Sequence, residues 1–195
     1  MGESMNRGRN LFNKHKKIIN ILVKLMSFLP IRLRKFLFTF FKNTEGILGI
    51  GIRYVLLRSI CKNCGDNVSI FPNVIIYSPE KLSLGNNVSI HSMCYIDATG
   101  EVQIGNDVSI AHGTTILSST HNYSKLSQPI KDQGMSFKKT ILEDNVWIGA
   151  KATILCGLVV KTGTIVGANT ILTKSFDKEL ILGGNPAKII QNRRD

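Results

Sequence analysis

Four histidines are the residues of this chain best suited to acid–base chemistry: His15, His91, His112 and His121. Histidine has an ordinary pKa of about 6.5, so it can take up or release a proton near neutral pH. His121 stands at the start of a long segment, SSTHNYSKLSQPIKDQGMSFKKT, which interrupts an otherwise regular pattern. A loop of this length that leaves a regular fold is usually either disordered or functional.

A six-residue repeat runs on both sides of this segment. Aliphatic residues lead the downstream hexads LEDNVW, IGAKAT, ILCGLV, VKTGTI and VGANTI. The same spacing recurs upstream at Leu84, Ile90 and Ile96 and, after one step of eight residues, at Ile104, Ile110 and Ile116. An α-helix would instead need apolar residues three and four positions apart, and a half-buried strand would need strict alternation. Repeats of six with an aliphatic lead are typical of a parallel β-helix.

The repeat divides the chain into predicted parts. Residues 1–62 form a basic amphipathic helical segment, residues 63–190 form the β-helix, and residues 191–195 form a basic tail. The protruding loop covers residues 118–140. We expect breaks in the helical segment near Pro30 and at the glycines of EGILGIG, and a short helix at the C-terminus.

The positive charge lies almost entirely in the helical segment. Residues 1–62 hold 13 Lys and Arg against 2 acidic residues, a net of +11, whereas residues 63–195 hold 12 against 11, a net of +1. Lys24 and Pro30 interrupt the most apolar stretch, which is shorter than the ~20 residues that span a bilayer. No cleavage site for a secretory signal follows it, so we expect a cytoplasmic protein.

Two interpretations of the helical segment remain open. It forms either a basic amphipathic helix at an anionic membrane surface or a helix pair that packs on the β-helix with its charges in water. The first would place the protein at the inner face of the membrane. Nucleic acid is not an expected partner, because no recognition motif is present.

The four cysteines do not form a recognisable metal or redox motif. Cys61 and Cys64 make one C-x-x-C without a second pair, and Cys94 and Cys156 stand alone. We interpret all four as reduced cysteines that serve as small apolar residues.

A set of motifs accompanies the hexads over roughly residues 64–190. A histidine follows the last hexad before the loop, and then come N-V-W-I-G, V-G-A-N-T, L-T-K and G-N-P-A-K. This combination resembles the hexapeptide-repeat acyltransferases, in particular the galactoside and maltose O-acetyltransferases and the O-acetyltransferases of bacterial surface-polysaccharide pathways. The resemblance implies an all-β fold, a left-handed parallel β-helix with an N-terminal helical segment and a protruding loop. It also implies a homotrimer that binds acetyl-CoA between subunits and requires no metal.

The resemblance assigns roles to particular residues. His121 matches the general base that takes the proton of an acceptor hydroxyl as the oxygen attacks the thioester. Three residues match or lie near acceptor contacts: His91, Asp97 and Trp147. In the relatives His91 is an asparagine, and the acidic residue lies two positions after Asp97. Residues matched to coenzyme A are Ala150 and Ala168 for the pantetheine arm, Thr173 and Lys174 for the nucleotide end, and Lys188, with Arg193 and Arg194, for the phosphates.

The expected function is therefore an acetyl-CoA-dependent O-acetyltransferase that acts on a sugar hydroxyl, of a bacterial surface glycan or its precursor. Three alternatives remain open: a serine- or amine-type acetyltransferase of the same fold, a γ-class carbonic anhydrase, and a non-catalytic β-helix scaffold. The carbonic anhydrase would need His91, His112 and His121 around a metal at a subunit interface.

Overall fold

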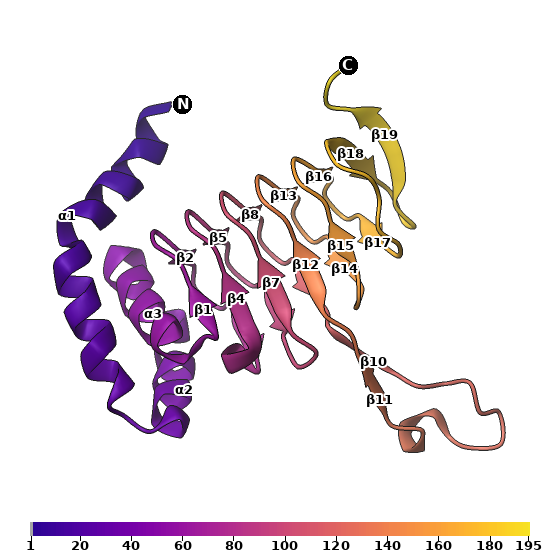
Figure 1. Cartoon of the computed structure of the whole chain (residues 1–195), viewed down its shortest axis with the longest axis horizontal. Helices are drawn as coiled ribbons and strands as arrows, with labels where there is room; N and C mark the ends of the chain where they lie inside the picture. Colours follow the sequence, from indigo (N-terminus) through magenta and orange to yellow (C-terminus); the bar gives the residue numbers. More distant parts are fainter. Residues whose placement is uncertain (1) are drawn as a thin grey trace.

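Three helices lead into the repeat in the computed structural model, which describes residues 2–195. They are α1 (Gly2–Ser27), α2 (Ile31–Phe40) and α3 (Gly46–Ile60), and a 3₁₀ turn, η1 (Phe41–Asn43), follows α2 (Figure 1). The chain breaks at Pro30, which precedes α2, and again at Thr44 and Glu45, directly before the glycines of α3. Among the described helices, none combines the length and apolar character that crossing a bilayer requires.

The repeat forms three parallel sheets along one axis, and each coil contributes one short strand to each sheet. Sheet A contains β1 (Asn63–Cys64), β4 (Leu82–Leu84), β7 (Val102–Ile104), β12 (Thr140–Leu142) and β15 (Val159–Val160). Sheet B contains β2 (Ser69–Ile70), β5 (Ser89–Ile90), β8 (Ser109–Ile110), β13 (Trp147–Ile148), β16 (Ile165–Val166), β18 (Leu180–Gly183) and β19 (Lys188–Asn192). Sheet C contains β3 (Ile75–Tyr77), β6 (Tyr95–Asp97), β9 (Thr115–Ile116), β14 (Thr153–Ile154) and β17 (Ile171–Leu172). A 3₁₀ turn, η2 (Pro79–Lys81), joins the first coil to the second.

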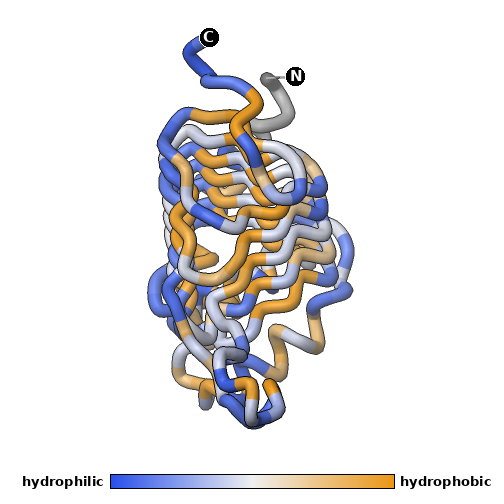
Figure 2. Tube along the Cα trace, turned by 90° about the vertical axis from the view of Figure 1, so that its right-hand side faces the viewer, coloured by the Kyte–Doolittle hydropathy of each residue, from blue (hydrophilic) through white to orange (hydrophobic). Residues whose placement is uncertain are grey.

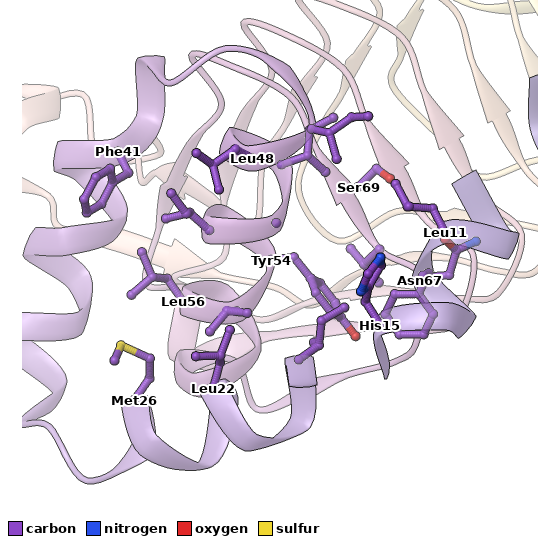
Figure 3. Close-up of a pocket in the computed structure, with 18 of the residues that line it drawn as sticks. Leu11, His15, Leu22, Met26, Phe41, Leu48, Tyr54, Leu56, Asn67 and Ser69 are labelled. Carbon is purple, nitrogen blue, oxygen red and sulfur yellow. The ribbon is translucent and has the colours of Figure 1, made fainter. Parts of the chain in front are cut away.

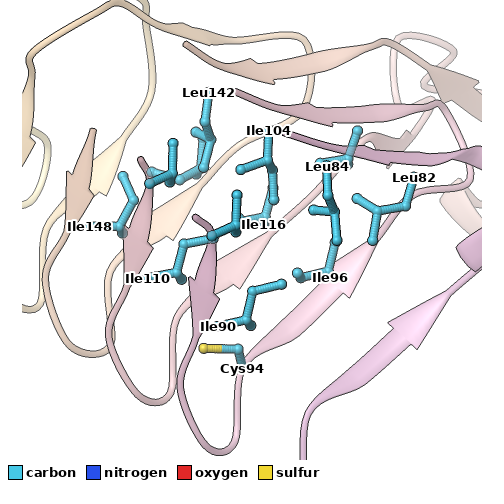
Figure 4. Close-up of a cluster of buried hydrophobic side chains, with 14 of the residues drawn as sticks. Leu82, Leu84, Ile90, Cys94, Ile96, Ile104, Ile110, Ile116, Leu142 and Ile148 are labelled. Atoms are coloured by element: carbon cyan, nitrogen blue, oxygen red, sulfur yellow. The ribbon is translucent and has the colours of Figure 1, made fainter. Parts of the chain in front are cut away.

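The hexad leads point into the β-helix and stack in columns. Ile90 pairs in register with Ile110, which pairs with Ile148, and all three side chains are completely buried (Figure 4). Figure 2 shows the apolar positions of successive coils lying over one another. Burying these side chains is the main favourable contribution to folding. The predicted parallel β-helix is confirmed.

The corners between sheets A and B carry a recurrent motif, GDNV, GNNV and GNDV, in which glycine is followed by two Asn or Asp residues, and contacts between coils explain the glycine and the residue directly after it. A side chain on Gly85 would place its Cβ 2.6 Å from the Gly105 backbone, so only glycine fits there. The Asn106 side chain accepts a hydrogen bond from the Asn86 backbone N–H (2.9 Å), and Asp144 does the same for Asn106 (2.7 Å). These bonds satisfy backbone donors that would otherwise lack partners at the corners.

Helix α3 covers the open end of the first coil. Leu57 is completely buried, and Tyr54 donates a hydrogen bond to the Gly65 carbonyl (2.8 Å). Arg53 is also buried and reaches the carbonyl oxygens of Ile70 (2.9 Å), Phe41 (3.1 Å), Lys42 (3.4 Å) and Thr44 (2.6 Å). Burial lowers the pKa of this guanidinium, although Glu45 opposes the effect. Arg53 therefore joins α3, η1 and the first coil of the β-helix.

The C-terminus forms a hairpin in place of the short helix expected there. Strand β19 pairs antiparallel with β18, the last parallel strand of sheet B, and becomes the edge of that sheet. The edge of a sheet offers unpaired N–H and C=O groups, and a returning strand satisfies them better than a one-turn helix would. Arg193 donates a hydrogen bond to the Gly163 carbonyl, and Arg194 forms an ion pair with Glu179.

The long loop is ordered and projects from the side of the β-helix (Figure 1). Its stem is a two-stranded antiparallel ribbon of β10 (Ser119–His121) and β11 (Met135–Phe137), and a 3₁₀ turn, η3 (Ile130–Asp132), lies near its tip.

Candidate active site

His121 is the last residue of β10, on the stem of the projecting loop. Its register partner across the ribbon is Met135, and its side chain is exposed to solvent. The position combines a strand with fixed pairing and an imidazole that a bound molecule can reach. These are the properties that a positioned general base needs.

Asp97 anchors the stem from the β-helix wall. The Ser119 hydroxyl donates a hydrogen bond to one carboxylate oxygen of Asp97, and the Thr99 backbone N–H donates to the other (2.9 Å). Asp97 is only 7% exposed. Burial raises the pKa of this carboxyl, but the hydrogen bonds from Ser119 and Thr99 outweigh it, so its pKa lies below the ordinary value.

The anchor acts on the same side of the ribbon as His121. Ser119 and His121 are two residues apart on one strand, and such side chains point to the same face. Among the hydrogen bonds of the described residues, none joins Asp97 to His121. Asp97 therefore positions the stem through Ser119, and it stands beside the catalytic candidate without touching it.

Two further side chains fix the points where the loop leaves and rejoins the β-helix. The Ser118 hydroxyl donates to the Asp97 carbonyl (2.6 Å) and accepts from the Gly100 N–H (2.7 Å). The Thr140 hydroxyl donates to the Leu117 carbonyl (2.6 Å) and accepts from the Gly157 N–H (3.0 Å). Both side chains are buried.

The body of the loop has its own hydrogen-bond network. The Gln133 amide donates to the carbonyls of Lys125 and Gln128, both at 2.8 Å, and accepts from the Lys125 N–H at 3.0 Å. Asn122, directly after His121, accepts from the Ser136 hydroxyl (2.6 Å). The residue beside His121 is therefore held from across the ribbon.

A second group of candidates lies at the B–C corner, the turn that leads from sheet B to sheet C. His91 stacks flat on Phe71, with ring centroids 4.5 Å apart. Partial burial lowers the pKa of His91, and the neighbouring His112 lowers it further. His91 is therefore neutral at pH 7, so it can both donate and accept a hydrogen bond.

Small residues continue this corner along the β-helix. His112, Ala150 and Ala168 follow their strands at the same position, and backbone hydrogen bonds link consecutive coils here: Lys151 to His112 and Asn169 to Ala150, both at 2.9 Å. A Cβ on Gly149 would lie 2.6 Å from the Ala168 nitrogen. The corner thus has small residues, Ala150 and Ala168, on consecutive coils, each followed by an exposed polar residue, Lys151 or Asn169, and His91 and His112 lie on the preceding coils.

Trp147 lies on β13, on the outer face of sheet B. Its register neighbours are Ser109 and Ile165, and its side chain is 53% exposed. An exposed indole offers a flat apolar face with one N–H donor.

Thr173 and Lys174 follow sheet C at the opposite, C–A corner, where the loop also leaves. Both are exposed, and the Lys174 ammonium lies 5.4 Å from the centre of the Phe176 ring. Lys188, the first residue of β19, is exposed too. Arg193 and Arg194, in contrast, are engaged with Gly163 and Glu179.

The candidate residues therefore form two groups on opposite edges of sheet C. Asp97, His121, Thr173 and Lys174 lie at or beyond the carboxyl ends of its strands, whereas His91, Ala150 and Ala168 lie before the amino ends. Trp147 belongs to the second edge, since β13 leads into that corner. Sequence reasoning named members of both groups but did not separate them.

Sequence reasoning also missed Ser119, Thr99, Ser118 and Thr140, which fix the stem. They are small polar residues in the two places where the hexads lose their spacing, between Ile96 and Ile104 and between Ile116 and Leu142, and no motif distinguishes them from ordinary turn residues. Their importance follows from contacts between coils.

Other chemical features lie elsewhere. Within the part of the chain that the structure describes, no group of three or more His, Cys, Asp and Glu side chains is placed to hold a metal ion. The four cysteines are free, and burial raises the pKa of Cys61. A cavity of about 710 Å³ lies among the helices, and another of about 390 Å³ lies along sheet A. Neither is lined by a candidate site residue.

Comparisons with known proteins agree with the fold. The structure of a hexapeptide-repeat acetyltransferase from Vibrio cholerae, in complex with acetyl-CoA, matches with a TM-score of 0.73 and 20% identity, over 83% of this chain and 86% of that one. No protein-family model matches the chain.

Curated relatives match over shorter stretches. A chloramphenicol acetyltransferase from Agrobacterium fabrum is 41% identical over 56 residues, 29% of this chain and 27% of that protein. A putative lipopolysaccharide biosynthesis O-acetyl transferase from Escherichia coli is 30% identical over 89 residues, 42% of this chain and 45% of that protein. The chain thus spans about a quarter of the first relative and under half of the second. The resemblance to hexapeptide-repeat acetyltransferases is confirmed.

Proposed function

We propose that this protein transfers an acetyl group from acetyl-CoA to a hydroxyl of a sugar, with His121 as the general base. The observation that carries the proposal is the exposed His121 on a stem that Asp97 fixes through Ser119. The similarity to named acetyltransferases supports the reaction class.

The proposed chemistry needs few parts. The imidazole of His121 takes the proton of the acceptor hydroxyl as its oxygen attacks the thioester carbonyl. A C–O bond forms, the C–S bond breaks, and the proton passes to the departing thiolate. The tetrahedral oxyanion needs a hydrogen-bond donor, for which a backbone N–H suffices.

The B–C corner fits the donor. Its small residues, including Ala150 and Ala168, let a linear pantetheine chain lie against the backbone. Thr173 and Lys174 lie at the opposite, C–A corner and would reach the nucleotide end from an adjacent copy; they are exposed, as is Lys188, and offer hydrogen bonds and positive charge.

The separation of the two groups of candidates favours an oligomer. They lie on opposite edges of sheet C in one chain. A site that uses both groups therefore needs the His121 edge of one copy to lie beside the B–C corner of another copy. We propose that the trimer implied by the sequence resemblance brings His121 of one copy near the B–C corner of its neighbour.

The acceptor is proposed to be a sugar of a surface glycan or of its precursor. His91, Asp97 and Trp147 are the candidate contacts: a neutral imidazole, a carboxylate and an exposed indole. The relative named for lipopolysaccharide biosynthesis supports this class. The relative named for chloramphenicol makes that compound the natural second acceptor to try.

The helical segment is proposed to rest on the anionic inner face of the membrane. Ile18, Ile21 and Leu25 recur at helical spacing on α1, and Phe28, in the turn directly after the helix, is 78% exposed. Exposed lysines lie on the same helix: Lys14, Lys17 and Lys24. An apolar stripe flanked by basic residues is the pattern of a helix that lies in the plane of a membrane surface.

The test is release of coenzyme A thiol from acetyl-CoA in the presence of an acceptor panel. Free sugars, nucleotide-sugars, a lipid-linked sugar and chloramphenicol form the panel, and we expect turnover with at least one sugar. The proposal would be contradicted if no compound of the panel raised thiol release above the rate measured without an acceptor and if the protein also did not bind acetyl-CoA. That result would favour a β-helix scaffold.

A further inference from the structure

A cavity of about 710 Å³ lies between α1, α3 and the first coil, away from the candidate active site (Figure 3). This volume falls within the ~300–1,000 Å³ typical of small-molecule sites. The side chains around it are almost all apolar, and the cavity opens to solvent where its lining residues are exposed: Leu11, Leu22, Ile47 and Leu48. Proteins seldom leave such a space at their surface unless something fills it.

Gly51 is the second observation that points to an occupant. It lines the cavity in the interior of α3, and a Cβ built on it would have no atom within 4 Å. The two other glycines of the helix have evident reasons: a Cβ on Gly49 would overlap the Thr44 carbonyl, and Gly46 has φ +72°. Glycine weakens a helix interior. Neither the backbone conformation nor the packing requires a glycine at residue 51. The absence of a side chain there leaves the cavity open.

The two ends of the cavity differ chemically. One end is lined by hydrocarbon and thioether side chains, among them Leu22, Met26 and Leu56 (Figure 3). The other end has the polar side chains of His15, Asn67 and Ser69. Lys14, Lys16 and Lys17 flank His15 on α1, and only Lys16 of these forms an ion pair, with Asp66 (2.6 Å), so the excess of positive charge beside this end favours a negatively charged head group.

We propose that this cavity binds the hydrocarbon chain of a single amphiphile that has an anionic, phosphate-type head group. The chain lies over Gly51 toward Met26 and Leu56, and the head group lies at the end with His15. A bound lipid would hold the protein at the membrane where glycan precursors are presented. That role rests on the proposed function, whereas the binding itself does not.

The direct test is isothermal titration of the full-length protein with dodecyl phosphate below its micellar concentration. We expect saturable binding of dodecyl phosphate and none of ethyl phosphate, which has the same head group without the chain. No binding of dodecyl phosphate by the wild-type protein would overturn the proposal.

Gly51→Phe is the sharpest variant, because its ring has open space and fills the cavity. We expect it to weaken dodecyl phosphate binding at least tenfold while the thermal unfolding temperature stays the same or rises. Asn20→Phe, at an exposed position of α1 that does not line the cavity, is the matched control and should bind like the wild type. Equal binding by Gly51→Phe and the wild type would place the amphiphile elsewhere and overturn the proposal.

Two additional readouts separate this site from its neighbours. Ile21→Ser, on the exposed stripe of α1 and outside the cavity, should weaken binding to anionic vesicles yet keep dodecyl phosphate binding. Acetyl transfer to a lipid-free sugar should be unchanged in Gly51→Phe. If Gly51→Phe instead dissociates an oligomer while the wild type ignores dodecyl phosphate, the cavity is a contact between copies and the proposal fails.

Discussion

The β-helix and the helices before it bury their apolar residues in opposite ways. In the β-helix every hexad lead is turned inward, and the surface is close to neutral, with 12 basic and 11 acidic residues over 63–195. In the helices large apolar side chains remain exposed, among them Ile21, Leu25 and Leu48, beside a strong excess of positive charge. The first region is complete as a folded body, whereas the second has a surface suited to another phase or molecule.

The polar groups show the same contrast. Corner donors of the β-helix are satisfied by repeated side chains such as Asn106 and Asp144. The helices rely on individual contacts: the buried Arg53 binds four carbonyl oxygens, of η1, Thr44 and β2, and Tyr54 binds the Gly65 carbonyl. A repeat spreads its stability over many equivalent contacts, whereas the helices are joined to it at a few points. We therefore expect chemistry to depend on the β-helix and lipid binding to depend on the helices.

The largest expected effect is the loss of activity when the proposed base is removed. His121→Ala should lower kcat by ~10²–10⁴-fold, because the acceptor hydroxyl loses its proton acceptor. Binding of acetyl-CoA should change little. His15→Ala makes the same substitution in the helices and should leave kcat on a lipid-free sugar near the wild-type value. Equal losses in both variants would break the proposed division between the two regions.

The two regions can be compared by making the same Ile→Ala substitution in each and measuring the free energy of unfolding. Ile110 is completely buried in the β-helix, whereas Ile21 is 61% exposed on α1. Ile110→Ala should lower the free energy of unfolding by about 2–5 kcal/mol, since it leaves a cavity in a packed column. Ile21→Ala should change it by less than about 0.5 kcal/mol. Urea denaturation of the two variants measures the difference, and similar losses would mean that α1 is covered in solution.

How far the sequence predicts this molecule depends on the range of the contacts involved. The hexads predict the β-helix because each lead residue is buried by its own coil and the adjacent coils. The burial of Ile90 or Ile148 can therefore be predicted from the few residues around it in the sequence. The C-terminal hairpin was missed because β19 forms only where sheet B offers an edge. Ser119 was missed because its partner, Asp97, lies 22 residues earlier and is brought near by the coiling of the chain. The cavity at Gly51 depends on how α1 and α3 pack, which no local pattern specifies.

A smaller effect is expected where Asp97 holds the stem of the loop. Asp97→Asn removes the charged acceptor of Ser119 and should cost about 1.5–3 kcal/mol of stability at pH 7. The folded pKa of Asp97 is lowered, so its contribution is fully present above the ordinary value of about 3.9 and is lost as the pH falls through the folded pKa. The difference between variant and wild type should therefore shrink toward pH 2 in urea denaturation curves. A difference that stays constant with pH would mean that the carboxylate charge does not hold the stem.

The smallest effect distinguishes charge on the helices from charge on the β-helix. Lys24→Gln should weaken binding to vesicles rich in anionic lipid by roughly fivefold, since a basic residue near such a surface contributes about 1 kcal/mol. Lys178→Gln changes the net charge by the same amount at an exposed position beyond β17 and should have no effect. Raising the salt concentration should remove the difference, because the Debye length falls to about 3 Å at 1 M. Equal weakening by both substitutions in a co-sedimentation assay would show that net charge alone draws the protein to the membrane. In that case the exposed apolar stripe of α1 would have no part in orienting it.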